Sequence, residues 1–392
     1  MSATSGQYDV VVVGAGASGL WAALELARDH DVVVMEAKSV GAGASGSAAG
    51  FVSAFPDWAT YPDAVTHAVE QFRWLDSQHG FSYVERPYVE LAETAAEAAS
   101  LQEDYAPLFD HDGYDIAYQA AEELAARWPD RLHLDGFHGG LVLEESGIIR
   151  PREYVASLAA VARERGVDVR TESPVDGVRA SSGEVVGVAT AGGEITAQTV
   201  VCAAGTGNTR LLAPFVDLPT RQFVYMNVEV EAPEFPETAP MFYGRDIWWR
   251  PDLDESGVLQ VSGGMYFLDE PGRPPSSPPE EYRGEIAAKL PAMAQDVADA
   301  DIVEGSYETC PSGSAITPDG LPILDTPAGG PEGLVVVSGV TGGISMSPFT
   351  GLAVRALVTG ENAPVPLDPF RLDRFDDPPS EFRVHGIREL PG

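Results

Sequence analysis

The sequence predicts an α/β protein with two parts: a nucleotide-binding domain on a mainly parallel sheet and a smaller domain on a mixed or antiparallel sheet. Three observations predict this class. Residues 10–36 read as strand, glycine turn, helix and strand, and residues 199–205 and 334–360 each carry a strand into another glycine turn. At 392 residues the chain exceeds one typical core, so two domains are expected.

The opening segment has the pattern of a Rossmann-type βαβ unit. Four valines at residues 10–13 are typical of a buried parallel strand, and the turn after them, GAGASG, begins at Gly14. A helix follows, and the second strand, residues 32–35, ends at Glu36. Glu36 lies 22 positions after Gly14, close to the spacing at which an acid binds ribose hydroxyls. The segment therefore predicts a dinucleotide site, and Glu36 would repel a 2′-phosphate.

The rest of the chain divides between the two expected domains. Helices are predicted at residues 62–79 and 93–128, and a hairpin at residues 184–198 leads into a strand that ends near Gly205. Aromatic, strand-like residues at 221–268 belong to the second domain. We expect a nucleotide domain at 1–85, 141–220 and 305–392, and a substrate domain at 86–140 and 221–304.

The closing segment predicts a second anion-receptive helix terminus. After a strand at residues 334–338 come three glycines, then Ser347 as N-cap and Pro348 as the first helical residue. A helix N-terminus behind a glycine turn offers unpaired amides and the positive end of the helix dipole. Two such termini in one domain suit a large, extended cofactor.

The amino-acid composition indicates a salt-rich environment and excludes nucleic acid as a partner. Sixty acidic and 24 basic residues give a net charge of −36, and only Lys38 and Lys289 are lysines. A dispersed acidic surface of this kind is typical of a cytoplasmic protein from an organism that accumulates salt. Nucleic acid is excluded as a partner because no basic footprint exists. Two cysteines form no disulfide framework or zinc site, and no signal peptide or transmembrane segment is recognised.

Five stretches in order resemble the amino-acid-oxidising flavoenzymes grouped around D-amino acid oxidase, glycine oxidase and monomeric sarcosine oxidase. They are VVVVGAGASGLWAALELA, GAGASGSAAG, VVCAAGTGN, TPDGLPIL and VVVSGVTGGISMSP. The resemblance covers nearly the whole chain and implies a Rossmann-type FAD-binding domain, discontinuous in sequence, beside a substrate domain. It implies FAD pyrophosphate over the first glycines, ribose at Glu36, ribityl and flavin near Ser45 to Ser47, and the flavin pyrimidine end at residues 342–347. The implied cofactor-binding residues are Gly14, Gly16, Ala17, Ser18, Gly19, Glu36, Ala37, Ser45, Gly46, Ser47, Ala204, Gly205, Gly342, Gly343, Ile344, Ser345 and Met346.

Departures from the family pattern bear on the flavin linkage and the electron acceptor. Ser47 stands where some relatives attach FAD through a histidine, so that link is excluded. Cys310 lies seven residues before Thr317, near but not in register with a cysteine that carries FAD in sarcosine oxidase. We expect non-covalent FAD, with a Cys310 link as the alternative. Sarcosine oxidase uses lysines above the flavin, one of them to promote oxygen reduction. No lysine occupies the matching positions in this sequence, which favours a dehydrogenase over an oxidase.

The expected reaction is hydride transfer to flavin N5 from the carbon beside nitrogen of a small amino acid or N-methylated amine, giving an imine that hydrolyses. Arg250 is the first candidate for binding the substrate carboxylate, with Arg221 behind it, and Tyr243 and Trp249 are candidate pocket walls. No catalytic base is required, and none is named. The alternatives are a 2-hydroxy acid dehydrogenase, a flavin-bearing electron-transfer subunit and a plain NAD-binding protein. The electron acceptor is left open.

Overall fold

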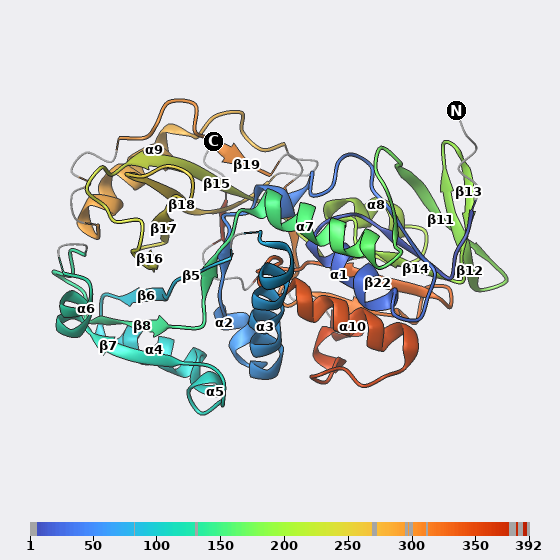
Figure 1. The fold of residues 1–392 in the computed structure, drawn as a ribbon, viewed down its shortest axis with the longest axis horizontal. Helices are drawn as coiled ribbons and strands as arrows, with labels where there is room; N and C mark the ends of the chain where they lie inside the picture. Colours follow the sequence, from blue (N-terminus) through green and yellow to red (C-terminus); the bar gives the residue numbers. More distant parts are fainter. Residues whose placement is uncertain are drawn as a thin grey trace.

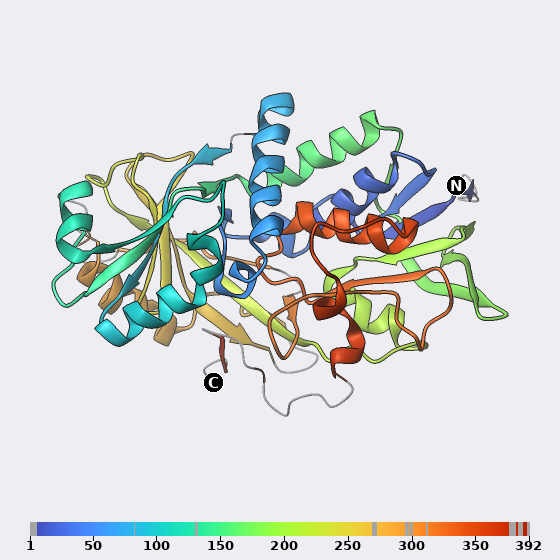
Figure 2. The same cartoon turned by 90° about the horizontal axis from the view of Figure 1, so that it is seen from below.

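The protein has two halves side by side, each built on its own large sheet (Figures 1 and 2). Both halves draw on segments that are far apart in the sequence. The computed structural model describes residues 6–81, 83–129, 132–268, 273–294, 297, 301–310, 313–375, 382 and 387–389.

The first half is organised by a six-stranded sheet that is parallel except at one edge strand, β21. Its order is β10 (Asp168–Arg170), β3 (Val32–Met35), β2 (Val10–Val13), β14 (Thr199–Cys202), β22 (Leu334–Ser338) and β21 (Ile323–Asp325). The structure thus confirms the α/β class and the strands predicted at 10–13, 32–35 and 334–338.

Both faces of this sheet are covered, which explains its unbroken valine runs. Val10 and Val12 pack with helices α1 (Ala17–Leu26), α7 (Pro151–Glu164) and α10 (Ser347–Thr359). Val11 and Val13 point the other way, onto a four-stranded sheet of β1 (Gly6–Gln7), β13 (Gly193–Thr196), β12 (Glu184–Thr190) and β11 (Val175–Ser181). Successive side chains of a strand alternate between faces, so every position must be apolar.

The second half is organised by a mixed ten-stranded sheet. Its main path runs β19 (Glu308–Thr309), β15 (Arg221–Glu231), β18 (Val258–Phe267), β17 (Ile247–Pro251), β16 (Met241–Gly244), β6 (Tyr88–Ala92), β8 (Gly139–Leu143) and β7 (Ile116–Ala120); β20 (Ser314–Ile316) pairs with β15 and β23 (Ile387–Glu389) with β18. One face carries the second apolar core, and the other carries the polar side chains described below.

The remaining elements connect or cover these sheets. Helix α3 (Pro62–His79) has the predicted bounds and stands between the two halves in Figure 1. A three-stranded sheet joins β4 (Phe51–Val52), β9 (Gly147–Ile148) and β5 (Val84–Glu85). The other helices are α2 (Pro56–Ala59), α4 (Ala95–Asp104), α5 (Ala106–Phe109), α6 (Ala121–Arg127), α8 (Asn208–Leu212) and α9 (Glu280–Lys289).

Two expectations are wrong in detail, and a third concerns a domain boundary. The region 93–128 is not wholly helical, because β7 lies within it and pairs with β8. Helix α10 begins at Ser347, so Met346 is its N-cap, and the Ser347 hydroxyl donates backwards to the Ile344 carbonyl oxygen (2.7 Å). Strand β8 spans the domain boundary expected at 140/141 and pairs entirely within the ten-stranded sheet. In the part of the chain that the structure describes, no helix has both the length and the apolar character needed to cross a membrane.

Candidate functional site

The glycine loop lies at the carboxyl edge of the parallel sheet, between β2 and α1. Gly14 has φ +109°, and a Cβ there would lie 2.5 Å from the Ala203 carbonyl oxygen at the end of β14. A Cβ on Gly19 would collide with the Gly14 carbonyl oxygen. The first and third glycines are therefore required for the turn and for close packing of helix on strand. Gly16 is the N-cap of α1, and Ala17 and Ser18 form its first turn.

Two polar side chains meet the amides of this loop. Glu36 follows β3, and its Oε2 accepts from the Ala15 amide (2.9 Å), while Ser45 Oγ accepts from the Ala17 amide (3.0 Å). Ser45, Gly46 and Ser47 lie in a short 3₁₀ turn, Ala44–Ser47, that approaches the N-terminus of α1. Ala37 directly follows Glu36. The loop, the acid and the small-residue turn, three of the predicted cofactor segments, are thus adjacent.

The turn before α10 is held by two hydrogen-bond chains. Trp21 Nε1 donates to the Tyr154 hydroxyl (2.7 Å), and this hydroxyl lies 2.9 Å from Ser347 Oγ, which donates to Ile344. Ser345 Oγ accepts from the Ser53 amide and donates to the Phe51 carbonyl oxygen, both at 3.2 Å. Gly342 has φ +59°, Gly343 follows it, and Met346 is buried. The turn is therefore fixed both to α1 and α7 and to the segment around Phe51.

Asn208 is a structural residue of this edge that sequence reasoning missed. Its Oδ1 accepts from the Ala204 amide (3.0 Å), and its Nδ2 donates to the carbonyl oxygens of Cys202 (3.3 Å) and Val337 (2.7 Å). The buried amide thus ties the end of β14 to the end of β22 and positions Ala204 and Gly205 beside the glycine loop. An asparagine directly after a strand and a glycine turn, as in AAGTGN, was the available signal.

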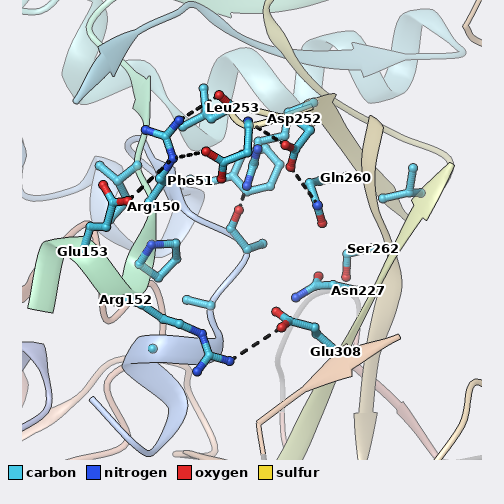
Figure 3. Close-up of a pocket in the computed structure, with 18 residues that line it drawn as sticks. Phe51, Arg150, Arg152, Glu153, Asn227, Asp252, Leu253, Gln260, Ser262 and Glu308 are labelled. Atoms are coloured by element: carbon cyan, nitrogen blue, oxygen red, sulfur yellow. Dashed lines mark hydrogen bonds and ion pairs between the residues drawn. The ribbon is translucent and has the colours of Figure 1, made fainter. Parts of the chain in front are cut away.

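A pocket of about 260 Å³ lies between the 46–51 segment and the ten-stranded sheet. Figure 3 shows Asn227, Gln260 and Ser262 on the strands of that sheet, with Phe51 and Arg152 across from them. Two ion pairs flank the pocket, Arg150–Asp254 (2.7 Å) and Arg152–Glu308 (3.5 Å), and each joins the start of α7 to the second half.

Arg250, the first candidate from the sequence for the substrate carboxylate, lines this pocket. Its side chain is only 7% exposed; Nε donates to the Ala49 carbonyl oxygen (3.0 Å) and one terminal nitrogen to Pro251 (2.9 Å). Among the described residues no carboxylate forms an ion pair with it. Burial lowers the pKa of Arg250 to about 10, so the guanidinium stays charged at neutral pH. A guanidinium has five N–H donors, and main-chain oxygens use two.

The other three substrate candidates have different positions. Tyr243 lies on the same face of the sheet as Arg250, with its ring 4.9 Å from that of Trp248. Trp249 is on the opposite face, 0% exposed and stacked on Phe242, because neighbouring residues of a strand alternate. Trp249 therefore does not line the pocket, and Trp248 is the tryptophan that lies on the same sheet face as Arg250. Arg221 lies over the Phe267 ring (4.0 Å) at the far end of β15 and does not line the pocket.

Glu90 is a buried acid on this face that the sequence analysis did not single out. It is 5% exposed and accepts a hydrogen bond from the Tyr105 hydroxyl (3.0 Å). Burial is the main reason that its pKa rises to about 7. The signal was available: a glutamate interrupts the otherwise apolar strand YVELA at the position that alternates with Tyr88.

Both cysteines are buried. Cys202 lies in β14, and burial raises its pKa to about 12. Cys310 is 3% exposed, and its Sγ lies 3.0 Å from the Gly313 carbonyl oxygen, to which it donates. In the residues that the structure describes, no group of His, Cys, Asp and Glu is arranged to hold a metal ion.

Comparisons with known proteins agree with this geometry. The sequence pattern of the DAO family, "FAD dependent oxidoreductase", matches residues 9–357. A glycine oxidase from Geobacillus kaustophilus is 28% identical over 386 residues, which cover 94% of this chain and 97% of that one. A probable sarcosine oxidase from Arabidopsis thaliana is 26% identical, with 98% of both chains covered.

Solved structures have the same fold. The crystal structure of glycine oxidase from G. kaustophilus superposes with a TM-score of 0.78 at 25% identity, covering 94% of this chain and 99% of that one. The L-proline dehydrogenase from P. horikoshii superposes with a TM-score of 0.83 at 19% identity, covering 95% and 98%. The likeness extends over both halves of the molecule.

Proposed function

Because the chain belongs to the DAO family of FAD-dependent oxidoreductases, we propose that it binds FAD at the carboxyl edge of the six-stranded sheet and oxidises a small amino acid or N-methylated amine. Bound FAD supplies the acceptor for the hydride lost from the carbon beside nitrogen, and water then hydrolyses the substrate imine. The single observation that carries the proposal is the meeting of the glycine loop, Glu36, the 44–47 turn and the turn before α10 at one edge.

The residues at this edge fit FAD. The N-terminus of α1 offers backbone amides to a pyrophosphate, and its N-cap, Gly16, has no side chain that would keep the phosphates away from them. Glu36 lies beside the loop, where a carboxylate can accept from ribose hydroxyls. The turn from Gly342 to Met346 precedes a 13-residue helix whose dipole favours negative charge, which supports its assignment to the pyrimidine end of the flavin. All the cofactor residues predicted from the sequence remain part of this proposal.

We assign the substrate carboxylate to Arg250. A planar guanidinium binds a carboxylate with two parallel hydrogen bonds, and this one is buried, charged and faces a pocket beside the 46–51 segment. Tyr243 and Trp248 form the neighbouring aromatic surface of the same sheet face. The amine enters uncharged, so the reaction requires no base from the protein.

We propose that the enzyme passes its electrons to an acceptor other than oxygen. Neither lysine lies in the pocket: Lys289 in α9 is 3.7 Å from Asp246, and Lys38 follows Glu36 on the exposed side of the first half. Anaerobic reduction by an amine, followed by slow reoxidation in air and rapid reoxidation by an added quinone or dye, is expected. Rapid reoxidation in air would assign an oxidase instead.

We propose that FAD is held without a covalent bond. Cys310 supports this, since its thiol is buried and donates to Gly313. After acid precipitation the flavin is expected in the supernatant, for the wild type and for Cys310→Ser alike. A yellow pellet from the wild type that becomes colourless in Cys310→Ser would establish a covalent link.

The half with the six-stranded sheet is our candidate for the FAD-binding domain, and the half with the ten-stranded sheet for the substrate domain. The segments 1–85, 141–220 and 305–392 and the segments 86–140 and 221–304 remain the proposed division. The pairing of β8 supports moving one boundary from residue 140 to a position after Leu143.

The first experiment is an absorption spectrum of the purified protein in high salt, followed by anaerobic addition of D- and L-amino acids, glycine, sarcosine and proline. Flavin bands that are bleached by an amine support the proposal. A protein that neither contains nor takes up FAD contradicts it. Bleaching by 2-hydroxy acids alone would assign the alternative dehydrogenase, and FAD that no donor reduces would favour an electron-transfer subunit.

A further inference from the structure

Two buried side chains of opposite charge lie on one face of the ten-stranded sheet. Arg250 is 7% exposed and Glu90 is 5% exposed. Within the described part of the chain, neither forms an ion pair with another side chain. A buried charge without an ionic partner is costly, so a pair of them on one surface requires an explanation beyond stability.

The strand pairing places both charges on the face that carries the pocket. Glu90 pairs with Tyr243, Tyr243 with Trp248, and Trp248 with Ser262. Partners in such a row point to the same side of the sheet, and Arg250 lies two residues beyond Trp248, again on that side. Two strand spacings and two residues along the strand separate Glu90 from Arg250, or roughly 12 Å between Cα atoms.

Aromatic side chains lie along the sheet face between the two charges. Tyr243 and Trp248 lie between them along the row, with their rings 4.9 Å apart. Phe51 lines the pocket, and its ring meets that of Tyr88 edge-on at 6.5 Å. Tyr88 precedes Glu90 by two residues on β6, so it lies on the same face. An apolar chain with a charge at each end would match this arrangement of basic, aromatic and acidic groups.

We propose that this face binds a substrate with two charged ends, the carboxylate at Arg250 and a second, cationic group, ammonium or guanidinium, at Glu90. The preferred substrates are then amino acids with a basic side chain, and the aromatic residues contact the methylene groups between the ends. This inference rests on the proposed function, which it narrows to one class of substrate.

The surroundings of Glu90 suit a cation. The groups that face its carboxyl are the hydroxyls of Tyr88 and Tyr105, Tyr243 and the more distant Asp104. Burial holds the pKa of Tyr88 and Tyr105 well above 10, so both remain neutral. In the absence of ligand the Glu90 pKa is about 7, and a bound cation would lower it. Preference for cationic ligands is therefore expected to increase from pH 6 to pH 8.

The test measures binding by calorimetry, without turnover, on the holoenzyme in high salt. The probes are 4-guanidinobutyrate, which has both charged ends, and pentanoate, which has only the carboxylate. The wild type is expected to bind 4-guanidinobutyrate roughly tenfold or more tightly than pentanoate, the range for a hydrogen bond to a charged group. Buried ion pairs are screened little by salt, so the preference persists there.

Three variants localise the effect. Glu90→Gln is expected to abolish the preference while leaving pentanoate binding unchanged, and Glu90→Asp to retain part of it. Glu25→Gln is the matched control, because Glu25 is also 5% exposed with a pKa raised by burial, yet it lies in α1 and pairs with Arg28 (3.1 Å).

Equal affinity for the two probes, no binding of either, or an unchanged preference in Glu90→Gln would overturn the inference. These outcomes are distinct from failure of the proposed function, which is an enzyme that lacks FAD or that no amine reduces. An enzyme that glycine reduces while the probes bind equally would keep the function and exclude the charged-end site.

Discussion

At the scale of single residues, the buried carboxyl of Glu90 makes stability depend on pH. Its pKa is about 7 in the folded protein against an ordinary 4.5, so the folded state binds a proton more tightly than the unfolded state. Stability is then complete below pH 4.5 and is lost as pH rises towards 7. Glu90→Gln is expected to be more stable than the wild type at pH 8, by about 3 kcal/mol at most, and equal to it near pH 4.5.

Thermal unfolding of the two proteins at both pH values, without added ligand, measures this difference. A gap of the same size at pH 4.5 and pH 8 would show that the substitution acts through packing rather than through the proton. Such an outcome would mean that burying the ionised Glu90 carboxylate does not lower the free energy of unfolding.

Gly14 is the residue on which the nucleotide loop depends. Gly14→Ala forces a Cβ to 2.5 Å from the Ala203 carbonyl oxygen at φ +109°, and the expected loss is about 1–3 kcal/mol together with loss of bound FAD. The matched control is Gly43→Ala, since no atom of the described residues lies within 4 Å of a Cβ there and its φ is −92°. Flavin absorbance per protein and the unfolding midpoint give both readouts. Retention of FAD by Gly14→Ala would contradict the assignment of the loop.

At the scale of secondary-structure elements, one phenol joins three helices. The Tyr154 hydroxyl of α7 contacts Trp21 Nε1 of α1 and Ser347 Oγ of α10. Tyr154→Phe leaves the Trp21 N–H buried without this acceptor, at an expected cost of about 1–3 kcal/mol. It also frees the turn before α10, so the absorption maximum of bound flavin is expected to shift.

The control is Tyr83→Phe. Both tyrosine rings pack on Phe72, at 5.8 Å for Tyr83 and 5.0 Å for Tyr154, but the buried Tyr83 hydroxyl has no hydrogen-bond partner among the described residues. Its removal should leave the unfolding midpoint unchanged or raise it. Equal losses in the two variants would assign the effect to the ring environment and not to the hydrogen-bond chain.

Elements were predictable from sequence where one local rule decides them. Four valines and three glycines determine β2 and its turn, and residues 62–79 form α3 as the helical pattern requires. The predictions failed where pairing between strands that are distant in the sequence determines the structure. Strand β7 forms from an alanine-rich stretch because of its register with β8, and only the register between β16 and β17 reveals that Trp248, not Trp249, lies on the same sheet face as Arg250. Glu90 is recognisable in the sequence as an acid within the apolar stretch YVELA, but its surroundings are not, because its neighbours come from distant strands.

At the scale of the whole molecule, charge sets the conditions for folding. A net charge of −36 repels itself, and salt at 1 M shortens the screening length to about 3 Å. The unfolding midpoint is therefore expected to rise steadily between 0.1 and 2 M KCl. Sucrose at matched osmolarity should raise it less, because it does not screen charge. A midpoint that is independent of KCl would exclude self-repulsion as a determinant of stability.

The interleaving of the two sheets has a consequence for synthesis of the chain. On the ribosome, β2 and β3 emerge first, but β14 follows only at residue 199 and β22 at residue 334, both on the same side of β2 in the sheet. The ten-stranded sheet likewise cannot form until β15–β18 have been synthesised and can pair with β6–β8. Each half therefore needs strands that are synthesised late, so the long-range contacts that slow folding form only after much of the chain has emerged. The early strands stay unpaired during that time, so we expect the yield of folded protein to depend on conditions that limit aggregation during synthesis.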